Sequence, residues 1–98
     1  MKAPLRQHRE AAETLAIQAL AYIAEQPETL GRFLDSSGIG AEQIRAASRE
    51  PGFLGGVLEH MLADETLLLG FARSAGIDPA EIARASDALG RRWERDLP

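Results

Sequence analysis

Two sixteen-residue segments of this chain are near copies of each other, and this repeat limits what the chain can fold into. FLDSSGIGAEQIRAAS occupies residues 33–48, and FARSAGIDPAEIARAS occupies residues 71–86. Seven of the sixteen positions are identical at a spacing of 38 residues, and the same spacing pairs Leu20 with Leu58. The repeat therefore predicts two approximate copies of a three-helix unit that together fill the 98-residue chain.

Each copy carries a glycine followed by isoleucine at its centre. Gly38 and Gly76 can adopt the left-handed conformation that ends a helix, and the next residue can fold back onto the last turn. In the second copy, residues 78–81 (DPAE) supply an N-cap, a proline at the first helical position and a carboxylate at the third. The first copy has Gly40 and Gln43 instead, a weaker start of the same kind. In both copies we predict a helix that ends at the glycine and a second helix that follows it.

The whole chain shows helical periodicity, and no segment alternates as a strand does. Six helices are predicted, over residues 7–25, 27–37, 41–49, 51–63, 65–75 and 79–94. A chain of this length suits a single domain. The fold class expected is all-α: a compact bundle of about six short helices, in which two three-helix repeats share one core. The domain covers residues 1–98, with an ordered part of about 7–94.

The first and fourth helices are equivalent in the two copies, and we expect them to pack centrally. Their apolar faces, with that of the last helix, form the predicted core: Ala12, Leu15, Ala16, Ala19, Leu20, Ile23, Phe53, Leu54, Val57, Leu58, Met61, Leu62, Ile82, Ala85 and Leu89. Three glycines lie in the fourth helix: Gly52, Gly55 and Gly56. Each weakens the helix by about 1 kcal/mol. This cost suggests tight packing, so we predict that the glycines let a neighbouring backbone approach closely.

Charge and composition exclude several classes of function. The formal net charge is -4, which opposes non-specific attraction to phosphate backbones. The absence of cysteine excludes disulfides and thiolate chemistry. Basic residues before the apolar run 14–24 imitate a secretory signal, but Glu10, Glu13 and Gln18 make this stretch an amphipathic helix. Eleven residues are also too few to cross a bilayer. We therefore expect a cytoplasmic protein with no membrane partner.

No constellation of residues points to catalysis, a cofactor or a metal. His60 and Asp64 lie four apart, the spacing of two ligands on one helical face, but two ligands do not make a site. Serines recur in the repeat, which favours a structural use at helix ends. Phosphate-binding glycine loops and nucleophile elbows are absent. The expectation is that the protein is not an enzyme and needs no cofactor or metal.

Two surface segments are candidates for binding. The spacing around each central glycine also fits a helix-turn-helix, in which the first copy would read DNA through Gln43, Arg45, Ser48 and Arg49. The second copy is unsuited to DNA, because the acids of residues 78–81 would meet a negative groove. The tail carries Arg91, Arg92 and Trp93, the composition of interface hot spots. Trp93 could equally close the bundle.

The chain resembles a small, mainly alphaproteobacterial family, domain of unknown function 3572. The residues that carry the resemblance are the segment ETLAIQAL at 13–20, Pro27, Leu30, Phe33, Leu34, Phe53-Leu54, Val57-Leu58, Asp64-Glu65 and Leu67-Leu68. It covers roughly Glu13 to Leu89 and implies an all-helical bacterial protein, without assigning an activity or a site to any position.

Together these features predict a small non-enzymatic helical protein that binds another macromolecule through a helix face. The alternative is a weak or accessory helix-turn-helix DNA-binding protein. Protein is the expected partner class and nucleic acid is disfavoured. The oligomeric state stays open, because alanine-rich helix faces can pair within a chain or between chains.

Overall fold

The structure, a computed structural model, describes the backbone of residues 5–95 and the side chains of residues 9–89 apart from Ala41 and Pro51. Within these residues it is all-α, as predicted, and contains no strand. The helices are α1 (Leu5–Ala24), α2 (Pro27–Ser37), α3 (Ile44–Ala47), α4 (Pro51–Leu62), α5 (Glu65–Ala75) and α6 (Pro79–Arg95), with a 3₁₀ turn, η1 (Ala41–Gln43), directly before α3.

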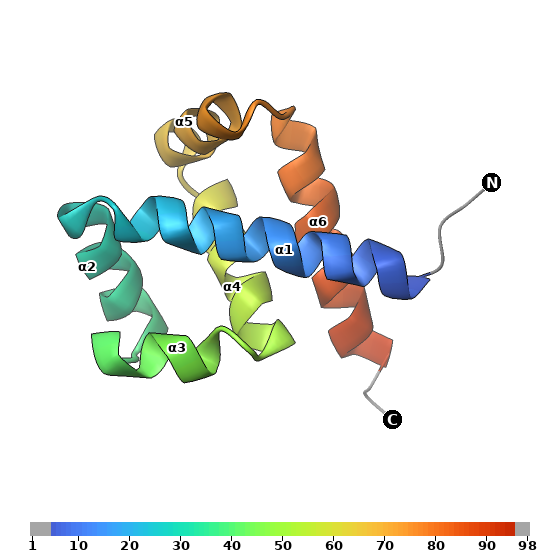
Figure 1. Ribbon diagram of the computed structural model, residues 1–98, viewed down its shortest axis with the longest axis horizontal. Coiled ribbons are helices and arrows are strands. Elements are labelled where there is room, and N and C mark those ends of the chain that lie inside the picture. The colour runs from blue at the N-terminus through green and yellow to red at the C-terminus, as the bar shows by residue number, and fades with distance from the viewer. Residues whose placement is uncertain (1–4, 96–98) are drawn as a thin grey trace.

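Two long-range crossings organise the bundle (Figure 1). α1 crosses in front of α4 and α6, and α6 packs against both α1 and α4. α2 and α3 lie to one side and below this crossing, whereas α5 lies above it. The molecule is 19 Å thick along its shortest axis, which is about two helix diameters. The core is therefore a single apolar layer between crossed helices.

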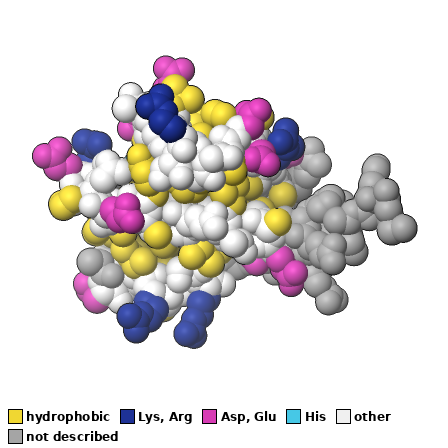
Figure 2. Space-filling view, turned by 45° about the horizontal axis from the view of Figure 1, so that its top comes forward, with side chains coloured by type: hydrophobic (Ala, Val, Ile, Leu, Met, Phe, Trp, Pro, Cys, Tyr) yellow, Lys and Arg dark blue, Asp and Glu magenta, His cyan; other side chains and the backbone are white. Residues whose placement is uncertain are grey.

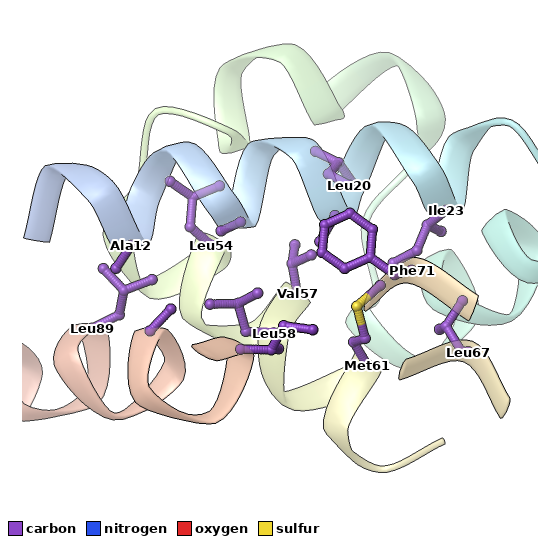
Figure 3. Close-up of a cluster of buried hydrophobic side chains, with 14 of the residues drawn as sticks. Ala12, Leu20, Ile23, Leu54, Val57, Leu58, Met61, Leu67, Phe71 and Leu89 are labelled. Carbon is purple, nitrogen blue, oxygen red and sulfur yellow. The ribbon is translucent and has the colours of Figure 1, made fainter. Parts of the chain in front are cut away.

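The buried side chains come mainly from the faces predicted for α1, α4 and α6 (Figure 3). Ile23, Leu58 and Ile82 are fully buried, and each stabilises the fold by about 1.5–3 kcal/mol through removal of its side chain from water. Leu15 and Phe53 are only half-buried and pack against the edge of the cluster. The remaining buried apolar residues are Ala12, Ala16, Ala19, Leu20, Phe33, Leu54, Val57, Met61, Leu67, Phe71, Ala72, Ala85 and Leu89.

The predicted glycine stops are confirmed. Gly38 has φ 77° and Gly76 has φ 70°, and both lie in the left-handed region. The Gly38 N–H donates to the carbonyl of Leu34 at 2.9 Å, which closes α2 with a single bond. After Gly76, the Ile77 N–H reaches back to the carbonyl of Ala72 at 3.0 Å, the longer bond of a Schellman motif. The second stop is therefore the more firmly bonded of the two.

The predicted helix starts are also present. Oδ1 of Asp78 accepts from the Ala80 N–H at 2.9 Å and caps α6. Before α3, the Gly40 N–H donates to Oε1 of Gln43 at 2.8 Å. This contact is the returning half of a capping box, in which the third residue binds the N-cap amide. Both starts satisfy helix-end donors that would otherwise lack an intrahelical partner.

The predicted helix over residues 41–49 is wrong in its extent. Only η1 and the four-residue α3 form there. Pro51 opens α4, and Glu50 before it is extended at φ −98° and ψ 122°, because the proline ring excludes the helical conformation from the preceding residue. This limit agrees with the predicted end at residue 49; the difference lies within the segment, where residues 41–43 form a 3₁₀ turn and α3 ends at Ala47. α6 meets no such proline and continues to Arg95.

The prediction of close backbone approach at three α4 glycines is also wrong. A Cβ atom added at Gly52 or Gly56 would meet nothing within 4 Å, and one at Gly55 would make an ordinary contact of 3.6 Å with Cβ of Leu89. Among the described glycines within helices, the tight one is Gly70 in α5, where an added Cβ would lie 2.7 Å from the hydroxyl oxygen of Tyr22. This contact joins α1 to α5, so the spacing of residues along α4 could not reveal it.

Candidate functional site

A groove of about 870 Å³ lies between the first turns of α6 and the middle of α1. Its floor is apolar and comes from both helices and from the residue between α5 and α6: Ala12, Leu15, Ile77, Ala85 and Ala88. Ala12 and Ala85 are buried, whereas the other three are half-buried against the core. Three of these five side chains are alanine, so the crossing of α1 and α6 is left partly unfilled. The space persists because small side chains line it.

The rim of the groove is polar and differs between its two walls. α1 presents Thr14 and Gln18, which are exposed and uncharged. α6 presents Glu81, Arg84 and Asp87, also exposed. An apolar floor within a polar, hydrogen-bonding rim is typical of binding sites. On the visible face, Figure 2 shows hydrophobic side chains at the surface across the middle of the molecule, with acidic and basic side chains around them.

The lining of the groove contains no pairing of a nucleophile with a base. Among the described residues that line the groove, Thr14 is the one with a hydroxyl, none is histidine, and both carboxylates belong to the α6 wall. A hydroxyl acts as a nucleophile when a base lies within hydrogen-bond reach of it. Within the described chain, Thr14 and Glu81 form no hydrogen bond with each other.

The two residues considered as metal ligands have structural contacts instead. The His60 ring packs edge-on against Phe33, with ring centroids 5.2 Å apart. Oδ1 of Asp64 accepts from the Leu67 N–H at 3.2 Å and caps α5. Within the described part of the chain, no three metal-ligating side chains of histidine, cysteine, aspartate or glutamate gather at one place.

The candidate DNA-reading residues lie on the segment around α3, away from the groove. Gln43, Arg45 and Arg49 are exposed, and the half-buried Ser48 donates from Oγ to the carbonyl of Arg45 at 2.8 Å. Oε1 of Gln43 is already bonded to the backbone N–H of Gly40. α3 itself spans four residues, or about 6 Å of helix. Arg45 lies in α3, whereas Gln43 ends η1 and Ser48 and Arg49 follow the helix.

The tail residues Arg91, Arg92 and Trp93 belong to the last turns of α6. Their side chains lie outside the described residues, so the choice between a partner contact and closure of the bundle stays a prediction. The groove is lined by the preceding part of the same helix, from Glu81 to Ala88.

Sequence reasoning missed the groove because its floor consists of residues that any amphipathic helix would bury. Ala12, Leu15 and Ala85 were all predicted as core. The available signal was the alanine content where α1 and α6 face each other, since alanine fills less space than leucine. That signal becomes useful only once the crossing of the two helices is known.

Residues 9–92 match the sequence model of a family described as a protein of unknown function, DUF3572, the family that the sequence resembles. No curated protein and no solved structure matches the chain. Along the described residues, every helix is too short or too polar to extend through a bilayer.

Proposed function

Because the chain belongs to the DUF3572 family, whose function is unknown, we propose its function from the groove: a small non-enzymatic bacterial protein of the cytoplasm that binds another protein between α1 and α6. The apolar floor within the polar rim carries this proposal. Amphipathic helices bind in such grooves by laying their apolar face on the floor and their polar flanks along the rim.

The groove suits a helix better than a small molecule. It lies between two helices, and its polar lining residues Thr14, Gln18, Glu81, Arg84 and Asp87 are all exposed. Small-molecule sites bury most of the ligand surface and orient it with a few converging polar groups. A helix needs only one side covered, so an open groove is sufficient for it.

The test is affinity capture from a bacterial lysate with the intact protein and an Ala88→Glu variant. Ala88 is half-buried in the groove, and a carboxylate there would charge the apolar floor. Ala80→Glu is the matched control, because Ala80 is exposed on the same helix and does not line the groove. We expect one protein to be retained by the intact chain and by the control but not by Ala88→Glu. A protein retained equally by all three, or none enriched at all, would contradict the proposal.

A second candidate function is weak DNA binding through the α3 segment, favoured by the exposed Gln43, Arg45 and Arg49. Against it stand the net charge of -4 and the single turn of α3, because a recognition helix places several side chains along the major groove. Electrophoretic titration at low salt tests this alternative. If the segment binds DNA, the protein retards the duplex in the gel, and combining Arg45→Ala with Arg49→Ala abolishes this shift. The absence of any shift at micromolar protein would exclude DNA binding.

A further inference from the structure

The central helices of the two halves bury equivalent positions. At the spacing of 38 residues, four successive core positions of α1 are buried, and so are their counterparts in α4. The pairs are Ala16 with Leu54, Ala19 with Val57, Leu20 with Leu58 and Ile23 with Met61. Between residues 16 and 23 of α1, one position differs: Ile17 is 49% exposed, whereas its counterpart Gly55 is buried.

Two aromatic contacts join the two halves of the chain. The Tyr22 ring of α1 packs against Phe71 of α5, with centroids 5.5 Å apart. The His60 ring of α4 packs against Phe33 of α2 at 5.2 Å. His60 is the counterpart of Tyr22, and Phe71 is the counterpart of Phe33. Each half therefore contacts the other through the same pair of positions, which is the pattern that an isologous two-fold arrangement produces.

The arrangement is incomplete at one place. In the second half, Leu89 of α6 covers Gly55, with its Cβ 3.6 Å from where a glycine Cβ would stand. The counterpart of Leu89 in the first half is Pro51, where the chain has already turned into α4. No described part of the first half therefore takes the place beside α1 that the second half of α6 takes beside α4.

We propose that the face of α1 around Ile17 is a docking site for an amphipathic helix of a partner protein, which lies on α1 as the second half of α6 lies on α4. Ala21 and Ala24 continue this face and are exposed. Their small side chains let a helix approach closely. Ile17, Ala21 and Ala24 do not line the α1–α6 groove, although Thr14 of its rim lies one turn from Ile17 on the neighbouring side of α1.

Charge complementarity defines the partner helix further. α4 and α6 run in opposite directions (Figure 1), so the residues after Leu89 run toward the N-terminal end of α4. A helix bound to α1 in the same way would run toward Glu10, which is exposed two turns before Ile17 on the same face. The partner is therefore a helix with a leucine-like anchor followed by basic residues. Opposite charges at the rim of an interface set its orientation and its rate of association.

The chain supplies a probe of this chemistry in its own α6 sequence. A peptide of residues 79–95 carries Leu89 followed by three arginines. A staple between positions 80 and 84 would hold it helical, because both residues are exposed. The labelled peptide is titrated with the full-length protein and with Ile17→Glu, and fluorescence anisotropy is measured. We expect saturable binding that weakens by at least about tenfold in the variant, as for loss of an anchoring residue.

The matched control is Leu69→Glu, because Leu69 of α5 is 44% exposed and is the other large hydrophobic residue found exposed in the described chain. Its affinity for the peptide should be unchanged, and so should that of the groove variant Ala88→Glu. Glu10→Lys should weaken binding by about threefold at low salt and have little effect at high salt. Thermal melts of each variant establish that it remains folded.

Three results would overturn the proposal. The peptide could fail to bind, or it could bind Ile17→Glu as tightly as the original chain, which would mean that it displaces the protein's own α6. Light scattering could instead show a dimer that Ile17→Glu dissociates, in which case a second copy of the chain covers this face. Loss of lysate capture in Ala88→Glu is independent of these outcomes, so the two surfaces are tested separately.

Discussion

The helices that follow Gly38 and Gly76 begin from nearly the same sequence but take different places in the fold. α6 runs for 17 residues and packs against α1 and α4. α3 stops after four residues. Ile82 of α6 is fully buried, whereas its counterpart Ile44 in α3 is only half-buried at the edge of the core. Similar local sequence thus determines that a helix starts, and the residues that follow determine how much of the core it covers.

This difference leaves the two halves unequally closed. The second half covers its central helix with Leu89, while the first half leaves Ile17 at the surface. The length difference between α3 and α6 therefore leaves the first half less covered than the second. The variants below test that comparison, beginning with the largest expected effect.

The first prediction compares the two equivalent isoleucines. Ile82→Ala should lower the free energy of unfolding by about 2–5 kcal/mol, because it opens a cavity in a fully buried site. Ile44→Ala should lower it by only about 1 kcal/mol, because solvent and a short helix can relax around the half-buried site. Urea denaturation measures both values. Equal losses would show that α3 contributes as much to the core as α6, and the comparison would fail.

The second prediction concerns the two helix stops. Gly76→Ala should lower the free energy of unfolding by roughly 1–2 kcal/mol, because a Cβ atom is strained at positive φ. Gly38→Ala should have a smaller effect, because the one-turn α3 that follows can shift while α6 is held by the core. Thermal unfolding measures this as a fall of about 4–8 °C in Tm per kcal/mol for a domain of this size. A larger fall for Gly38→Ala would reverse the proposed order.

The third prediction uses the glycines of α4 and α5. Gly56→Ala should raise the free energy of unfolding by about 1 kcal/mol, because Gly56 is exposed with nothing within 4 Å and alanine favours a helix. Its counterpart in α1 is Gln18, so the change makes the two helices more alike. Gly70→Ala should gain less, because its Cβ would lie 2.7 Å from the hydroxyl oxygen of Tyr22. Combining Gly70→Ala with Tyr22→Phe should restore the full increase in the free energy of unfolding. Calorimetry measures this quantity for the two single glycine variants and for the combination.

Much of the fold could be predicted from local sequence. The bounds of α2 and α5 agree with the prediction, since a proline or an acidic residue starts each helix and a glycine ends it. The core faces of α1, α4 and α6 follow from helical spacing alone. The extent of α3 was predicted wrongly: the predicted helix over 41–49 already stopped before Glu50, as Pro51 requires, but residues 41–43 form a 3₁₀ turn and α3 ends at Ala47.

The candidate surfaces could not be predicted in the same way. The groove exists because α1 and α6, far apart along the chain, cross where alanines face each other. The exposure of Ile17 depends on which helix fails to reach it, and the tight contact at Gly70 depends on Tyr22 from another helix. The sequence by itself determined where helices begin, where they end at glycine and which side of each is apolar, because these depend on neighbours within one or two turns. Only the tertiary structure decided which apolar side chains remain at the surface, because burial depends on the helices that pack against them.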